Sequence, residues 1–328
     1  MNYYLGVDAG ATKTYAILTD ETGNWLASGR SGPGNHQINV ELANSNIKDA
    51  VFQALNQANL QPADIRVAWF GLAGADREAD YRILRPMIQS YGFANAHIVC
   101  DTIIAMRAGT AKPYGAVLIC GTGMNAAGIN KHGQMIQCGG FGYAFGDFGG
   151  GSELSIEAFR TVIRAWEGRI KPTLLTDLIL QTLGYGSVEE MFHHFLDLHK
   201  RIPSDLTKLI FDAAARGDQA SIQILQKQGA ELGLSARSVI ERLLMQDENF
   251  DLVLAGSVLT KGNGEFIHPY IAKEVREAAP GCQLNILTVE PVVGSILLAM
   301  EKDGMTIAAS TYEKLGQITN IKGVVYHE

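Results

Sequence analysis

The residues best suited to chemistry lie in one stretch, from Val99 to Gly151. It holds an aspartate that ends an apolar run (Asp101), a Gly121-Thr122-Gly123 turn, and a glycine-dense loop ending at Asp147. Eleven of the chain's 36 glycines lie between Gly121 and Gly151, and glycine is favoured where a backbone must approach a ligand closely. A turn that can hold phosphate, flanked by two carboxylates, is what phosphoryl transfer to an alcohol requires.

Two copies of one pattern position these residues. The pattern is a strand, a Gly/Thr turn, a second strand, a tight turn and a third strand. It begins at Tyr3 and again at Gly115, about 110 residues later. We therefore predict an internally duplicated α/β protein, each half with a βββαβ-type core. The predicted strands are Tyr3–Asp8, Thr14–Thr19, Trp25–Gly29, Ile65–Gly71, Ala96–Cys100, Gly115–Cys120, Asn125–Asn130, Gln134–Gln137, Leu252–Ala255 and Leu284–Leu287.

The duplication predicts two domains, residues 1–114 and 115–328, with the hinge near Lys112–Tyr114. A mostly helical insertion, about residues 152–248, interrupts the second domain. Apolar residues at helical spacing from Leu225 to Leu243 predict a helix of roughly 25 residues there. Val292–Met300 should be a closing helix whose apolar face packs against either domain.

Composition narrows the class of protein. The 328 residues are 47% hydrophobic with a formal charge of −7, which argues against nucleic acid or an anionic membrane as partner. The four cysteines have no C-x-x-C spacing and are interpreted as reduced, buried thiols. The first residues lack a basic segment and a long apolar run, so neither signal peptide nor membrane span is expected. We predict a soluble cytoplasmic protein.

The turn after the first strand is the first candidate phosphate site. Asp8, Gly10, Thr12 and Lys13 precede a second strand, unlike a Walker A loop, which leads into a helix. Backbone N–H groups of such a hairpin can face a phosphate, and Asp8 would reach Mg²⁺. Alone, the pattern favours a plain glycine-bearing hairpin with a surface lysine. The matching turn with Thr122 and Gly123 makes coincidence less probable, because the two turns would face each other across a cleft and hold one nucleotide.

Taken together, these motifs resemble those of the sugar kinase, actin and heat-shock chaperone superfamily, over nearly the whole chain. They are VDAGATKT, the strand-end Asp101, CGTGMN, CGGFGYAFGD and the late LAGSV. The likeness is greatest to the N-acetylglucosamine kinase branch, which includes the BadF/BadG-type ATPases. The resemblance implies a two-domain ribonuclease H-like (actin-like ATPase) fold with a ligand cleft between the domains.

Asp101 is the predicted catalytic base. A carboxylate at the carboxyl end of a strand projects into the crevice where such sheets bind ligands, and an Asp can accept the proton of the attacking hydroxyl. The resemblance puts the family's catalytic Asp at this position. The alternative is a helix N-cap before Thr102, and the two roles are compatible.

The remaining predicted contacts divide between sugar and nucleotide. Polar groups that hydrogen-bond several sugar hydroxyls in a closed site discriminate strongly between substrates. Asp147 could instead be a turn residue, and Gly256-Ser257 a plain strand-to-helix turn. Met124 stands where the family often has Ser, and Phe148 where a relative has Glu. The predicted sugar contacts are Asn35, His36, Asp101, Met124, Asn125, Gly140, Phe141, Gly142 and Asp147. The predicted nucleotide contacts are Asp8, Gly10, Thr12, Lys13, Thr122, Gly123, Ala214, Gly256 and Ser257.

The resemblance thus implies an ATP- and Mg²⁺-dependent kinase for the 6-hydroxyl of N-acetylglucosamine or a close relative, active in amino-sugar metabolism and cell-wall recycling, and a homodimer. Glucosamine and N-acetylmuramate are alternative substrates. The alternative from another class is a BadF-type ATPase activator of a partner enzyme. Such activators share a metal cluster between subunits, and the cysteines here are poorly placed for one. A sugar-sensing regulator is disfavoured because Asp8 and Asp101 are both present.

Overall fold

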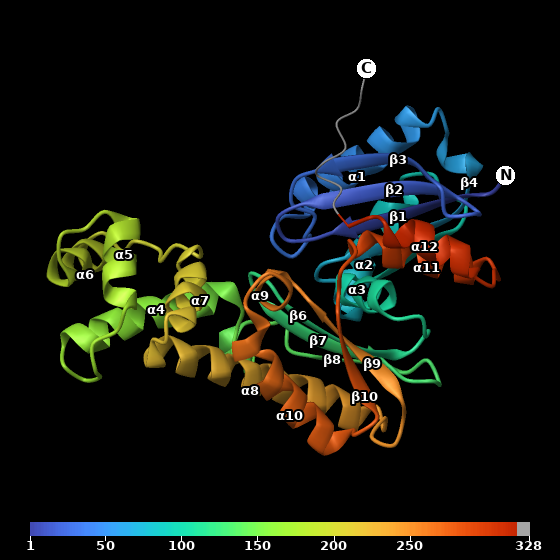
Figure 1. Ribbon diagram of the computed structural model, residues 1–328. Coiled ribbons are helices and arrows are strands. Elements are labelled where there is room, and N and C mark those ends of the chain that lie inside the picture. Colours follow the sequence, from blue (N-terminus) through green and yellow to red (C-terminus); the bar gives the residue numbers. More distant parts are fainter. Residues whose placement is uncertain (320–328) are drawn as a thin grey trace. The chain divides into compact units, whose positions relative to one another are not determined.

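A five-stranded sheet in the order β3-β2-β1-β4-β5 forms the centre of the first unit of the computed structural model (Figure 1). β1 and β2 are antiparallel, as are β2 and β3, whereas β4 is parallel to β1 and β5 to β4. The structure describes residues 1–319. The strands are β1 (Tyr3–Ala9), β2 (Thr14–Asp20), β3 (Trp25–Ser31), β4 (Ile65–Leu72) and β5 (Ala96–Cys100).

Helices cover both faces of this sheet because alternate strand residues point to opposite sides. Leu5 belongs to a core formed with α1 (Val40–Gln57) and α2 (Glu78–Gln89). Its neighbour Tyr4 belongs to a second core, formed with α11 and α12. The helices of this second face are α11 (Val292–Lys302) and α12 (Ala309–Gly316), and α3 (Asp101–Gly109) packs against α11. A short helix, η1 (Pro62–Asp64), precedes β4.

The second unit repeats the plan. Its sheet has the order β10-β9-β6-β7-β8, so a meander again lies beside two further strands. α8 packs on β7 and β8, and α10 packs on α8 (Figure 1). The predicted duplication is therefore confirmed. The strands are β6 (Gly115–Cys120), β7 (Met124–Ile129), β8 (Met135–Cys138), β9 (Phe250–Ala255) and β10 (Cys282–Ile286).

Five α-helices lie between β8 and β9, as the predicted insertion requires. α8 has 24 residues and buries Leu225, Leu232 and Val239 on one stripe. The five are α4 (Gly151–Trp166), α5 (Leu175–Leu183), α6 (Val188–Asp197), α7 (Leu206–Ala215) and α8 (Gln219–Arg242). Shorter or later elements are η2 (Tyr143–Phe145), α9 (Ser257–Thr260), η3 (Gly264–Phe266) and α10 (His268–Ala278).

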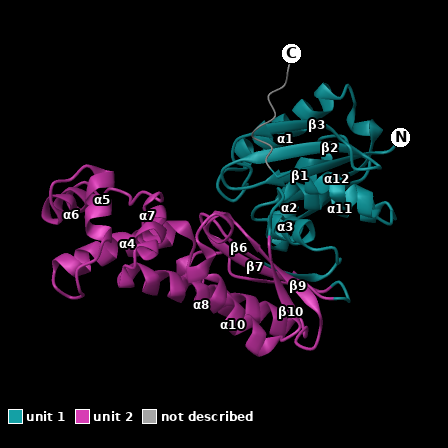
Figure 2. Cartoon of the chain, viewed as in Figure 1, with its two compact units in different colours: residues 1–117, 131–133, 287–328 teal, residues 118–130, 134–286 magenta. Residues whose placement is uncertain are grey.

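The two compact units divide the chain differently from the predicted domain bounds (Figure 2). The first unit comprises residues 1–117, 131–133 and 287–328, and the second residues 118–130 and 134–286. Residues 287–328, expected in the second domain, belong to the first unit because α11 packs on β1, β4 and α3. Among the helices of residues 1–319, none is long and apolar enough to cross a bilayer.

Candidate active site

Asp101 is the first residue of α3, directly after β5. The N-cap is therefore Cys100 rather than Asp101. The thiol of Cys100 donates a hydrogen bond to Oδ1 of Asp101 at 3.3 Å. A carboxylate in the first turn of a helix is also favoured by the helix dipole. The side chain is thus held at the carboxyl end of its strand.

Asp8 and Asp101 interact electrostatically within the first unit. Burial raises the pKa of Asp8 to about 7, with the charge of Asp101 as the next cause, while Lys13 opposes the shift. Burial likewise raises the pKa of Asp101 to about 6, against the hydrogen bond from Cys100. Such shifts are common in catalytic groups that exchange protons near neutral pH.

The β1–β2 turn carries the other predicted phosphate contacts. Its ends are closed by a hydrogen bond from the Gly10 N–H to the Lys13 carbonyl at 2.9 Å. Thr12 is exposed at the tip. Lys13 Nζ lies 3.8 Å from a Glu290 oxygen and 4.5 Å from the centre of the Tyr15 ring. The turn is therefore a well-formed hairpin with an accessible hydroxyl.

The segment with Asn35 and His36 is anchored to this turn through Gly34. The Gly34 N–H donates a hydrogen bond to the Gly10 carbonyl at 2.9 Å. His36 is buried, and its Nε2 lies 3.3 Å from Oδ1 of Asp80. Within residues 1–319, Nδ1 of His36 has no hydrogen-bond partner. Although burial favours the neutral acid, hydrogen bonds from Arg77 and then Gln37 hold the pKa of Asp80 well below its usual range. His36 is thus fixed beside a carboxylate, with one ring nitrogen available.

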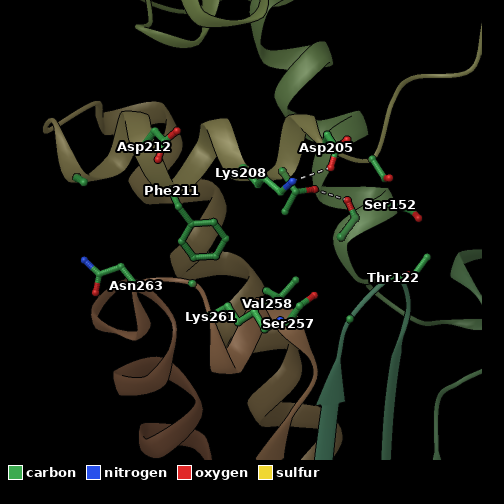
Figure 3. Close-up of a pocket in the computed structure, with 16 residues that line it drawn as sticks. Thr122, Ser152, Asp205, Lys208, Phe211, Asp212, Ser257, Val258, Lys261 and Asn263 are labelled. Atoms are coloured by element: carbon green, nitrogen blue, oxygen red, sulfur yellow. Dashed lines mark hydrogen bonds and ion pairs between the residues drawn. The ribbon is translucent and has the colours of Figure 1, made fainter. Parts of the chain in front are cut away.

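The second unit contains a cavity of about 620 Å³ (Figure 3). Thr122 and Ser257, both predicted nucleotide contacts, line it. The cavity lies where the β6–β7 turn, the start of α4, α7 and the segment after β9 meet. Its lining residues are Gly121, Thr122, Gly151, Ser152, Ser204, Asp205, Thr207, Lys208, Phe211, Asp212, Ala215, Ser257, Val258, Lys261, Gly262 and Asn263.

The β6–β7 turn, residues 121–123 (the nucleotide turn), is bonded to the start of α4. The Gly151 N–H donates to the Gly121 carbonyl at 2.8 Å, and the Ser152 N–H donates to the Thr122 carbonyl at 3.1 Å. Gly256 packs against Gly121 from the other side. Gly123 is exposed. Two segments distant in sequence, the start of α4 and Gly256, therefore hold this turn beside the cavity.

Helix α7 supplies a wall of the cavity that the sequence interpretation missed. Figure 3 shows the Phe211 ring pointing from α7 toward Val258 and Lys261. The predicted contact Ala214 is buried in the helix, and its neighbour Ala215 lines the cavity instead. Phe211 and Lys208 precede Ala215 by one and two helical turns and therefore lie on the same face of α7. This helical periodicity was the sequence signal that could have identified the wall.

The loop after β8, residues 139–148 (the sugar loop), is organised by Asp147. One carboxylate oxygen, Oδ2, accepts hydrogen bonds from the backbone N–H groups of Gly140, Phe141 and Gly142 at 3.0, 2.9 and 2.6 Å. Asp147 is buried, whereas Phe141 is 45% exposed. The turn role considered for Asp147 is therefore present, and its second oxygen is not engaged by these three donors.

The sugar loop lies against Asn125. A Cβ on Gly140, whose φ is +92°, would be 2.7 Å from Nδ2 of Asn125, so only glycine fits. Within the described residues, the buried Oδ1 of Asn125 has no hydrogen-bond partner. Met124 is buried beneath the same loop beside Gly139. The structure therefore brings the six predicted sugar contacts of this unit together, with an unused amide oxygen among them.

The first unit's carboxylates suit Mg²⁺. This ion is usually bound by one or two carboxylates plus substrate phosphates and water. Within residues 1–319, no group of three or more His, Cys, Asp or Glu side chains could hold a metal, so a cage made only of protein is not available there. Burial and then the charge of Asp101 raise the pKa of Asp8, and a bound cation would favour its ionised form. The donor set therefore fits a metal that arrives with phosphate.

Comparison with known sequences gives a family match over most of the chain. Residues 5–299 match a sequence profile of the BadF/BadG/BcrA/BcrD ATPase family. An N-acetylmuramic acid/N-acetylglucosamine kinase from Clostridium acetobutylicum is 28% identical over 91% of this chain and 98% of its own length. An N-acetyl-D-glucosamine kinase from Dictyostelium discoideum is 28% identical over 90% of this chain and 97% of its own.

Solved structures share the fold. A Chromobacterium violaceum protein proposed to be an N-acetylglucosamine kinase has a TM-score of 0.69 at 21% identity, covering 91% of this chain and 99% of that one. A ROK family glucokinase from Streptomyces griseus, solved with glucose and AMPPNP, has a TM-score of 0.59 at 18% identity, covering 92% and 100%. The expected two-domain, actin-like α/β fold is thereby confirmed.

Proposed function

The chain belongs to the BadF/BadG/BcrA/BcrD ATPase family, and on that premise we propose that it is an ATP-dependent amino-sugar kinase. It phosphorylates the 6-hydroxyl of N-acetylglucosamine or a close relative. The two curated relatives, each aligned over nine-tenths of this chain, are kinases for N-acetylglucosamine, and one also carries the name of N-acetylmuramic acid. Glucosamine is a further candidate, because a third relative is a glucosamine kinase from Vibrio cholerae.

The observation that carries the proposal is the Asp101 carboxyl, which begins α3 and has a pKa raised to about 6 by burial. Such a carboxylate is ionised at neutral pH yet basic enough to accept a proton as a sugar hydroxyl attacks phosphorus. Cys100 donates its thiol hydrogen to Oδ1, and in this proposal the carboxylate faces the sugar hydroxyl. His36, Asn35 and Asn125 orient the sugar through its other polar groups.

ATP is the phosphoryl donor in this proposal. The cavity of about 620 Å³ in the second unit has the size of a ligand site. Phe211 provides an aromatic face for the base, and the exposed Thr122 provides a hydroxyl for phosphate oxygens. The AMPPNP bound to a protein of the same fold supports the choice of nucleotide. The β1–β2 turn, with Gly10, Thr12 and Lys13, would approach the same phosphates from the first unit.

Further parts of the proposal extend the family resemblance. Mg²⁺ is held by Asp8 together with nucleotide phosphates, and it supplies neutralisation of charge as the phosphoryl group moves. The protein acts in the cytoplasm as a homodimer, in amino-sugar metabolism and cell-wall recycling. Its two domains close on the ligands and exclude water.

An ATPase activator of a partner enzyme is the second candidate, favoured by the name of the family. A metal cluster shared between subunits needs accessible thiols, but Cys100, Cys120 and Cys282 are buried, and Cys138 is only partly exposed. This arrangement supports the kinase instead.

ADP release from Mg²⁺-ATP decides between them, measured over a panel of N-acetylglucosamine, N-acetylmuramate, glucosamine, N-acetylmannosamine and glucose. A kinase gives one equivalent of ADP per sugar 6-phosphate formed, with clear preference for an amino sugar. Steady ATP turnover that no sugar stimulates would contradict the proposal.

A further inference from the structure

We propose that Gln228 is a positioning residue that joins the nucleotide turn to the sugar loop, so that a nucleotide bound beside Thr122 orders the loop. The inference rests on the proposed function, because it concerns the same two binding regions. All of its contacts lie within the second unit.

Gln228 lies on α8 and has no exposed surface. Its Nε2 donates a hydrogen bond to the Gly149 carbonyl at 2.8 Å and lies 3.6 Å from Sγ of Cys120. Because a carbonyl oxygen only accepts, the Gly149 contact fixes the orientation of the amide. One side chain therefore contacts the residue just before the nucleotide turn and the residue just after the sugar loop.

The amide of Gln228 uses its donor but not its acceptor. Within residues 1–319, the buried Oε1 of Gln228 has no hydrogen-bond partner. An unpaired buried acceptor is destabilising, and a methionine of similar volume would remove it but would also take away the donor to the Gly149 carbonyl. What glutamine adds is the donor to Gly149, which ties two loops to a long helix.

Backbone contacts join residues 149–152, next to Gln228, to the nucleotide turn. Gly151 and Ser152 donate their N–H groups to the carbonyls of Gly121 and Thr122. A Cβ on Gly150 would collide with the Gly123 carbonyl, so turn and glycines are in direct contact. When the turn moves, residues 149–151 must move with it.

The same glycines continue into the sugar loop. Phe148 precedes them, and Lys227 Nζ lies 4.7 Å from the centre of its ring, a second link from α8. Asp147 then holds the three N–H groups at residues 140–142. A nucleotide that fixes the turn therefore restricts the loop, and a loop fixed by sugar restricts the turn, since such coupling is reciprocal.

Hydrogen–deuterium exchange of the full-length protein tests this, with Mg²⁺-AMPPNP and no sugar. In the native protein, AMPPNP should slow exchange at residues 140–142 and 149–152. Gln228→Met should lose about fivefold of that protection, because one buried hydrogen bond is removed.

Asn130→Ala is the matched control. Asn130 also donates a buried hydrogen bond, from Nδ2 to the carbonyl of Leu243 just after α8 at 3.2 Å, but at the other end of β7. It should keep the protection. Gln228→Leu replaces the methionine variant if that protein does not fold.

A calorimetric titration with N-acetylglucosamine, with and without AMPPNP, measures the coupling itself. AMPPNP should tighten sugar binding to the native protein, and Gln228→Met should reduce that gain about fivefold. Equal loop protection and equal coupling in the native protein and Gln228→Met would overturn the inference. If AMPPNP protects the loop but no amino sugar binds, the proposed substrate is wrong and the link through Gln228 stands.

Discussion

Asp147→Ala tests whether one carboxylate organises the sugar loop. The change removes the acceptor shared by the N–H groups of Gly140, Phe141 and Gly142. At about 1 kcal/mol net for each hydrogen bond, the ordered loop loses about 3 kcal/mol. That corresponds to a factor of about 100 in the population able to bind sugar. We expect KM for the sugar to rise by about that factor and KM for ATP to stay within about threefold.

Exchange measured without sugar separates this role from direct sugar binding. In Asp147→Ala, the amides of residues 140–142 should exchange much faster than in the native protein before any ligand is added. Asp147→Asn is the matched control, since its amide oxygen can still accept at the same place, and it should fall between the two. If sugar KM rises while loop exchange in the free protein is unchanged, Asp147 acts only as a sugar ligand and the reasoning is refuted.

Three further predictions follow from the charges and the cavity. The kcat/KM of the kinase should fall about tenfold per pH unit below about pH 6, because the Asp101 base, with its pKa raised to about 6, must be ionised; a profile flat down to pH 5 would contradict this. Asp8→Asn should raise the melting temperature at pH 8 in EDTA. Because the pKa of Asp8 rises from 3.8 to about 7 in the folded state, its ionised carboxylate destabilises the fold above about pH 7. An unchanged or lower melting temperature would contradict this prediction. Phe211→Ala should raise KM for ATP about tenfold through lost ring contact, with sugar KM unchanged; Trp166→Ala, on the exposed side of α4, is the control and should alter neither.

Most of the fold follows from local sequence patterns. Strands such as Ala96–Cys100 and Gly115–Cys120 occur where their apolar runs and flanking glycines predict them. The duplication was visible because both copies repeat the same turn chemistry. The assignment of residues 287–328 was not visible, since an apolar helix such as Val292–Lys302 fits either sheet until its packing partners are known.

The candidate site was predicted less evenly. Glycines and acids at strand ends identified the nucleotide turn, Asp101 and the sugar loop, because backbone geometry demands those residue types. The α7 wall escaped notice because Phe211 and Lys208 are ordinary members of an amphipathic helix. Gln228 escaped for a similar reason, since a buried polar residue on α8 is revealed only by the tertiary contacts that it makes.

Asp101→Asn tests the central claim most directly. The amide keeps the shape of the side chain but cannot accept a proton from the hydroxyl. With N-acetylglucosamine and Mg²⁺-ATP, we expect sugar affinity by calorimetry to stay within about threefold and ADP release to fall by a factor of about 100 or more. Near-native ADP release in the presence of sugar would contradict the account.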